Sequence, residues 1–156
     1  SQHTSSVATR QSSWHGSSDM VADGWLAVTP PDMVETAPAF YKIFVDDLEQ
    51  SIEFYGACLG FTEQRRIDAG KFDEIILAPS KQGASLVLCR WKDGRAIDQG
   101  GAQGPTGYFV SDVDEIVDRM TKRGATPVLG PVDYSGMRIA VLADPDGHQI
   151  ELLARS

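Results

Sequence analysis

The sequence lacks several features that would each point to a particular class of protein. Only two of its 156 residues are cysteines, too few for a disulfide framework. No apolar run approaches the roughly 18 residues of a membrane-spanning helix, and residues 1–35 show no secretory signal. Positive charge is also scarce, because 14 Lys and Arg against 22 Asp and Glu give a net charge of −8, which opposes binding to nucleic-acid phosphates. We therefore expect a reduced, cytoplasmic setting, with no membrane and no nucleic acid among the partners.

The chain is expected to divide near residue 40. Residues 1–20 contain seven serines and few apolar residues, so they cannot bury enough surface to offset the entropy of ordering. Prolines in residues 21–39 disfavour helix and central strand, which predicts an extended segment. Residues 1–39 are thus predicted to be a leader or arm that either stays free or lies across a partner subunit.

From residue 40 onward the sequence alternates between strand and helix patterns. An apolar, β-prone run over 40–45 predicts a strand. Asp46 and Asp47 then begin a helix with acidic groups in its first turn, and Gly60 ends it. The strands predicted next cover about 61–68, 72–78 and 84–91, and a glycine-rich linker follows over 93–104.

The same pattern then recurs about 64 residues later, which indicates an internal repeat. Val110-Ser111-Asp112-Val113 matches Val45-Asp46-Asp47-Leu48, and Gly124 matches Gly60. The predicted elements are a strand at 106–110, a helix from Asp112, and strands at about 125–130, 136–143 and 148–154. We therefore predict an α+β fold of two tandem βαβββ modules, 40–92 and 105–154, whose strands form a curled mixed sheet with outer helices and a concave inner face.

Three motifs give this arrangement a family resemblance. They are DLEQSIEFY at 47–55, LGF at 59–61 and DPDGHQIEL at 144–152. Together with the repeat, they resemble the vicinal oxygen chelate superfamily, the glyoxalase and bleomycin-resistance fold, over residues 40–154. The resemblance implies paired βαβββ modules and dimers. It leaves the function open, because the superfamily includes lyases, epimerases, dioxygenases, transferases and non-catalytic drug-sequestering proteins.

The resemblance also implies four metal ligands in the members that use a metal, on the first and last strand of each module. In this sequence the four positions fall near Phe40, at Val87, at Pro105 or Thr106, and at Glu151. Phenylalanine, valine and proline offer no side-chain donor, and threonine is a poor neutral ligand. A conventional metal centre is therefore not expected, and no cofactor is predicted.

The predicted concave face is apolar and aromatic, which is typical of a pocket for a small organic ligand. Strand alternation assigns to it Phe40, Lys42, Phe44, Ser85, Val87, Cys89, Trp91, Gln149, Glu151 and Leu153. Glu151 is the first catalytic candidate, either as a general base or in a structural ion pair with Lys42 or an arginine. Either Glu74 or its neighbour Asp73 must point toward this concave face, which we call the cup. A pair of Glu74 and Glu151 there would divide the roles of general acid and general base.

Four further side chains have two possible roles each, one in ligand binding and one in the structure. Lys42 either meets an anionic ligand or extends to solvent. Arg138 either binds a carboxylate or phosphate of the ligand or forms an external salt bridge. Trp91 and Tyr108 either stack on a planar ligand or belong to the core. The one histidine outside the leader region, His148, is expected to be exposed at the exit of a turn.

Three functions therefore compete. The first is a metal-free protein that binds a small organic molecule. The second is a lyase or isomerase that uses Glu151 as base or, less readily, a divalent metal. The third is an accessory subunit whose arm docks on a partner. A homodimer is expected for the first two, because a second chain covers open sheet edges.

Overall fold

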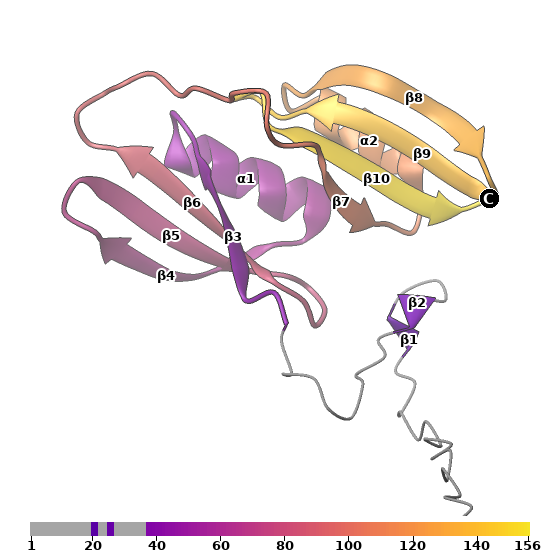
Figure 1. Cartoon of the computed structure of the whole chain (residues 1–156), viewed down its shortest axis with the longest axis horizontal. Helices are drawn as coiled ribbons and strands as arrows, with labels where there is room; N and C mark the ends of the chain where they lie inside the picture. The colour runs from indigo at the N-terminus through magenta and orange to yellow at the C-terminus, as the bar shows by residue number, and fades with distance from the viewer. Residues whose placement is uncertain (1–19, 22–24, 27–36) are drawn as a thin grey trace, which may run out of the picture. The chain divides into compact units, whose positions relative to one another are not determined.

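The computed structural model describes residues 20–21, 25–26 and 37–156 (Figure 1). The chain divides into two compact units, Ser1–Thr36 and Ala37–Ser156. In the first unit, strand β1 (Met20–Val21) pairs antiparallel with β2 (Trp25–Leu26). Most of the predicted arm lies outside the described residues, and its contact with a partner subunit stays a prediction.

The first module of the second unit has five elements in the predicted order. They are β3 (Phe40–Phe44), α1 (Leu48–Leu59), β4 (Thr62–Asp68), β5 (Phe72–Ala78) and β6 (Ser85–Trp91). The sheet order is β3-β6-β5-β4, in which β3 runs parallel to β6 and the other pairs are antiparallel. A strand, a crossover helix and a meander of three strands thus make one βαβββ module.

The second module repeats this arrangement. Its elements are β7 (Thr106–Phe109), α2 (Val113–Thr121), β8 (Thr126–Tyr134), β9 (Met137–Ala143) and β10 (Gln149–Arg155). The order β7-β10-β9-β8 matches that of the first sheet. The predicted α+β fold of two βαβββ modules is confirmed. Within one chain, the strands form two four-stranded sheets and not one continuous sheet.

Equivalent aspartates begin both helices. The side chain of Asp47 accepts a hydrogen bond of 3.0 Å from the backbone N–H of Gln50, and Asp112 accepts one of 3.0 Å from that of Glu115. Each bond satisfies an N–H group that has no partner inside the helix. Gly60 ends α1 in the left-handed conformation, at φ 72°.

One strand is longer than predicted. β8 extends to Tyr134 although the sequence suggested an end near residue 130, where Gly130 and Pro131 stand. Proline is tolerated here because β8 is the edge strand of its sheet and its pairing with β9 is irregular between Leu129 and Val132. A two-residue turn at 135–136 then leads directly into β9.

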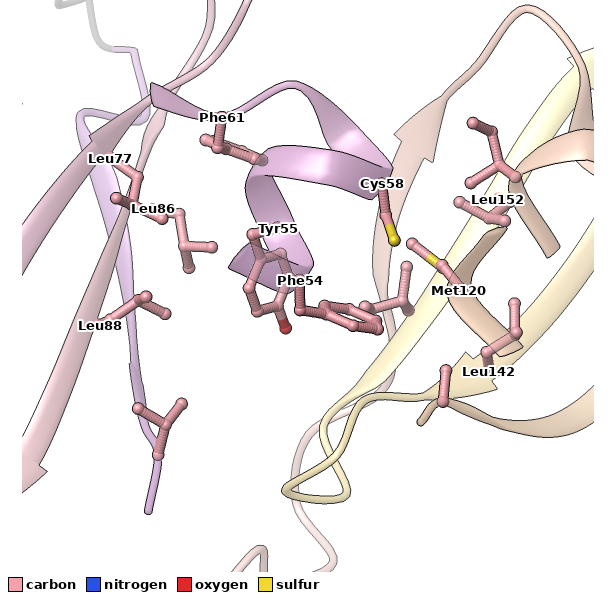
Figure 2. Close-up of a cluster of buried hydrophobic side chains, with 14 of the residues drawn as sticks. Phe54, Tyr55, Cys58, Phe61, Leu77, Leu86, Leu88, Met120, Leu142 and Leu152 are labelled. Carbon is pink, nitrogen blue, oxygen red and sulfur yellow. The ribbon is translucent and has the colours of Figure 1, made fainter. Parts of the chain in front are cut away.

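The hydrophobic core lies between the two sheets and contains both helices (Figure 2). Figure 2 shows Leu77 and Leu86 of the first sheet on one side of α1, and Leu142 and Leu152 of the second sheet on the other. Met120 of α2 lies close to Cys58 of α1 in the same view. Because each sheet turns one face toward this shared core, the opposite, outer face of each sheet points away from it. No helix of the described residues is long and apolar enough to cross a membrane.

Candidate functional site

The outer face of the first sheet carries most of the predicted wall residues. Strand register pairs Lys42 with Val87, Phe44 with Cys89, and Glu74 with Cys89. Paired residues project to the same side of a sheet, so these side chains share one face. The residues placed together on this face are Phe40, Lys42, Phe44, Phe72, Glu74, Ile76, Ser85, Val87, Cys89 and Trp91. Glu74, and not Asp73, is therefore the carboxylate of β5 on this side.

A salt bridge lies near the middle of this face. The ammonium Nζ of Lys42 donates to Glu74 Oε2 at 2.7 Å. The Glu74 side chain is 13% exposed and that of Lys42 is 37% exposed, so the carboxylate is shielded while the ammonium stays within reach of solvent. This hydrogen bond is the main reason that the pKa of Lys42 is raised, which keeps its positive charge in place.

An aromatic cluster borders the salt bridge. The rings of Phe44 and Trp91 stack at a centroid distance of 4.3 Å with an interplanar angle of 9°, and Phe72 meets both edge to face. The guanidinium of Arg95 lies 4.2 Å from the centroid of the Trp91 ring. Because Trp91 is already stacked on Phe44 and approached by Arg95, a planar ligand would have to displace one of them to stack on the indole.

Two of the predicted wall residues are covered. Val87 is 2% exposed and Cys89 is 0% exposed, although both belong to the outer face. Their contact with a ligand therefore stays a prediction. Burial also raises the pKa of the Cys89 thiol to about 11.

The outer face of the second sheet carries Gln149 and Glu151. Glu151 is half-buried and pairs in register with Gly107 of β7 and Val141 of β9. Exposed apolar side chains accompany it on this module: Phe109 is 38%, Leu129 54%, Val132 40% and Tyr134 71% exposed. The one carboxylate of this face thus stands in a broad apolar surface.

Two predicted ligand contacts lie on the wrong side of this sheet. Tyr108 pairs with Leu152, which is fully buried, and packs against the core, where its hydroxyl bonds to that of Tyr41. Arg138 extends toward α2, where Nε and Nη2 donate to Asp114 at 2.9 and 2.8 Å. Tyr108 is one position from Gly107 and Arg138 is three positions from Val141, the two register partners of Glu151, so alternation turns both side chains to the opposite face.

The predicted carboxylate pair is not assembled within one chain. Glu74 belongs to the first sheet and Glu151 to the second, and their outer faces point away from the shared core. Lys42 is paired with Glu74, so it is not the partner of Glu151. Two grooves of about 360 and 350 Å³ are lined entirely by residues between Val45 and Ile97, so neither joins the two modules.

The turn between β9 and β10 attaches the second module to the first. Asp144 is buried and accepts a hydrogen bond of 2.7 Å from the hydroxyl of Tyr55 on α1. Its other oxygen accepts from the backbone N–H groups of Asp146 and His148, at 2.9 Å each. The carboxylate therefore organises its own turn and holds α1 at the same time.

Two more contacts complete this attachment. Asp146 Oδ1 accepts a hydrogen bond of 3.0 Å from the backbone N–H of Asp46, and burial raises the pKa of the Asp146 carboxyl. His148 Nε2 lies 2.7 Å from the carbonyl oxygen of Phe44, which requires a proton on that nitrogen. His148 is half-buried, so its expected place as an exposed turn residue is wrong.

The residues at the four expected metal positions do not fit a divalent ion. Phe40 and Val87 supply no donor atom, and the third position offers only Pro105 or the neutral hydroxyl of Thr106. Glu151 alone could act as a ligand, and a stable site needs three or more convergent donors. Among the described residues, His, Cys, Asp and Glu form no group of three or more suited to a metal ion. The described residues therefore give no basis for a step through a metal.

Sequence reasoning missed three residues of the first outer face. Phe72 and Ile76 follow from alternation once Glu74 is assigned to that face. Arg95 lies in the linker, whose sequence has no period, and nothing in the pattern places its guanidinium on Trp91.

Comparison with known proteins identifies the family. Residues 19–152 match the Glyoxalase/Bleomycin resistance protein/Dioxygenase superfamily. The chain belongs to this superfamily. The resemblance read from the repeat and the three motifs is thereby confirmed. The superfamily fold accounts for the two modules, their equal strand order and the outer faces described above.

Relatives within the superfamily carry different descriptions. A lactoylglutathione lyase of Neisseria meningitidis is 32% identical over 118 residues, which are 71% of this chain and 85% of that protein. The solved glyoxalase I of Leishmania major is 31% identical with a TM-score of 0.65, over 76% of this chain and 86% of that one. TnmS3, an antibiotic-binding protein from Streptomyces, is 27% identical with a TM-score of 0.63, over 80% and 99%.

Proposed function

We propose that this chain binds a small, largely apolar and aromatic organic molecule without a metal ion. The observation that carries the proposal is that Phe40 and Val87 stand at two of the four expected metal positions, on a face rich in aromatic rings. Among its relatives, the lyases and the antibiotic-binding protein represent the two alternatives. The donor-poor face favours binding over metal-assisted lyase chemistry.

The proposed binding cup is completed by a second copy of the chain. One chain turns its two outer faces away from the shared core, so a closed pocket needs the first sheet of one copy opposite the second sheet of another. Leu129, Val132 and Tyr134 expose 40–71% of their surface on the second module, which is apolar area that such a contact would bury. Among the described strands, β3 and β7 each pair on one side only, which leaves edges that a second copy can cover.

The cytoplasm is the proposed location. Cys58 and Cys89 are the two cysteines of the sequence, and both are free and buried. A reducing compartment is consistent with free thiols in a protein that forms no disulfide.

Binding of naphthalenemethanol, a neutral two-ring probe, tests the proposal. Titration calorimetry should show saturable binding by the wild-type chain. Phe40→Ser should weaken it about tenfold or more, because burial of an aromatic ring contributes roughly 1.5–3 kcal/mol. Phe40 is 56% exposed, so its replacement leaves the core intact. Wild-type protein with no saturable binding of the probe would contradict the proposal.

One observation favours a second candidate, an enzyme of the lyase or isomerase type. Glu151 is a half-buried carboxylate on an apolar face and is suited to remove a proton from a bound molecule. In this account Glu151 acts as a general base beside a carbonyl group of the substrate, while Glu74 stays paired with Lys42.

Glu151→Gln separates the two candidates. If the chain forms lactoylglutathione or another product by proton transfer, the substitution should lower kcat about 100-fold or more. Affinity for naphthalenemethanol should stay within about threefold, because glutamine keeps the shape of the side chain. A variant with unchanged turnover would exclude Glu151 as the base.

A further inference from the structure

One ammonium group lies among the aromatic rings of the first outer face. Lys42 Nζ is 5.6 Å from the ring centroid of Phe40 and 5.6 Å from that of Phe72. Lys42 also pairs in register with Val87. Phe40 and Val87 are the residues at two of the expected metal positions. A positive charge of the chain itself therefore stands beside the positions from which metal ligands are missing.

Glu74 holds this charge in place without covering it. The hydrogen bond of 2.7 Å fixes one N–H of the ammonium on Glu74 Oε2, which is itself largely shielded. An ammonium has three N–H donors, and Glu74 is its one hydrogen-bond partner within the described part of the chain. Two donors therefore remain for an acceptor on a ligand, and Lys42 is exposed enough to offer them.

Cations of the chain already lie over the aromatic rings of this face. Lys42 lies over the rings of Phe40 and Phe72, and Arg95 lies over Trp91. Glu74, the carboxylate on this face, is paired with Lys42. A cation would have to displace one of these groups, whereas an acceptor oxygen can use donors that are already present.

We propose that Lys42 binds an oxygen atom of the ligand, and that the ligand is a flat aromatic compound bearing a carboxylate, phenolate or carbonyl group. This inference rests on the proposed function, since it concerns the same cup. The ammonium of Lys42 then supplies the positive charge that attracts the oxygen atom of the ligand to the first outer face. Glu74 holds this ammonium in position.

Three probes of equal ring area test the inference by calorimetry. They are naphthoate, neutral naphthalenemethanol and naphthylmethylammonium, which differ in their head group. The wild-type chain should bind naphthoate most tightly and the ammonium least tightly. Charge-assisted hydrogen bonds are the stronger ones, so naphthoate should exceed the neutral probe by about tenfold or more.

Two substitutions should act in opposite directions on naphthoate. Lys42→Met keeps the length of the side chain and should weaken naphthoate binding about 10- to 100-fold, while the neutral probe changes by less than about threefold. Glu74→Gln removes the neutralising carboxylate and should tighten naphthoate binding severalfold. Lys81→Met makes the same charge change in an exposed turn and should leave all three affinities unchanged.

The outcomes distinguish this inference from the proposed function. Binding of the neutral probe with no effect of Lys42→Met on naphthoate would overturn the role of Lys42 and leave the proposed function standing. If the ammonium probe binds most tightly and Glu74→Gln abolishes its binding, the carboxylate of Glu74 recognises the ligand. That result would also overturn the role of Lys42. Wild-type protein that binds none of the probes would contradict the proposed function, and this inference with it.

Discussion

At the scale of single residues, burial decides which side chains of the outer face meet a ligand. Phe40 is 56% exposed, whereas Val87 and Cys89 on the same face are buried. Trp91 is stacked on Phe44 and covered by Arg95. The accessible chemistry is therefore concentrated in Phe40, the ammonium of Lys42 and the rings around it.

The two thiols provide a pH-dependent prediction. Burial raises the pKa of Cys58 and of Cys89 from 9.0 to about 11. A folded state that raises the pKa of an acid binds its proton more tightly than the unfolded state does. The contribution to stability is therefore complete below about pH 9, and the free energy of unfolding falls as pH rises from about 9 to 11. Cys89→Ala should reduce this fall in denaturant titrations across that range.

Thiol labelling provides the matching control. At about pH 8 the native chain should react slowly with a disulfide reagent, and both thiols should react once guanidinium unfolds it. Rapid labelling of the native wild-type chain would contradict the described burial.

Alternation predicted the outer face of the first sheet well, because each strand there has one side packed on a helix. It assigned no face to Tyr108 or Arg138. The register of β7 and β9 with β10 places Tyr108 beside Leu152 and Arg138 beside Ala154, on the core side. The contact between the guanidinium of Arg95 and the ring of Trp91 could not be predicted. Arg95 lies in the linker, whose sequence has no periodic pattern.

At the scale of elements, the turn between β9 and β10 is one of the contacts that hold one module against the other, beside the shared core. Asp144 accepts a hydrogen bond from the Tyr55 hydroxyl, and Asp146 accepts one from the backbone N–H of Asp46. His148 donates a hydrogen bond to the carbonyl oxygen of Phe44. The bonds to Phe44 and Asp46 reach the connection between β3 and α1, and the bond to Tyr55 reaches the inside of α1. The orientation of the first outer face thus depends on a turn in the other module.

Tyr55→Phe tests this attachment. The substitution removes the hydroxyl and leaves one oxygen of the buried Asp144 carboxylate without that donor, which should lower the free energy of unfolding by about 1.5–3 kcal/mol. Tyr134→Phe removes a hydroxyl from a residue that is 71% exposed, and should change it by less than about 0.5 kcal/mol. Equal effects of the two substitutions in urea titrations would contradict the role of the turn.

The elements themselves could be predicted because their signals are local. Asp47 and Asp112 begin the helices where the sequence indicated, and Gly60 ends the first. The end of β8 could not be predicted, because a proline usually ends a strand. Pro131 is tolerated since β8 lies at the edge of its sheet, and that position is a property of the whole sheet. The contacts of the DPDG turn are also nonlocal, since they join residues about 90–100 positions apart.

At the scale of the whole molecule, the proposed cup needs a second copy of the chain. The two outer faces carry complementary parts: an aromatic wall with Lys42 and Glu74, and an apolar wall with Glu151. The sequence predicted both walls but placed them in one cup, because the repeat does not reveal how the modules turn relative to each other.

Leu129→Asp tests the proposed homodimer. Leu129 is 54% exposed, so the fold of one chain should tolerate the charge, while an apolar interface between copies should not. Sedimentation equilibrium should show a dimer for the wild-type chain and for Gln82→Asp, a control in an exposed turn. Leu129→Asp should shift the equilibrium to monomer and abolish naphthalenemethanol binding. A monomeric wild-type chain that binds the probe would contradict the shared cup.

The most direct test of the account is the metal content of the purified chain after dialysis against Zn²⁺ or Ni²⁺ and removal of free ion. Elemental analysis should find far less than one ion per chain, and Glu151→Gln should not change the value. About one ion per chain, lost in Glu151→Gln, would contradict the account, because it would mean that donors converge on Glu151 where Phe40 and Val87 provide none.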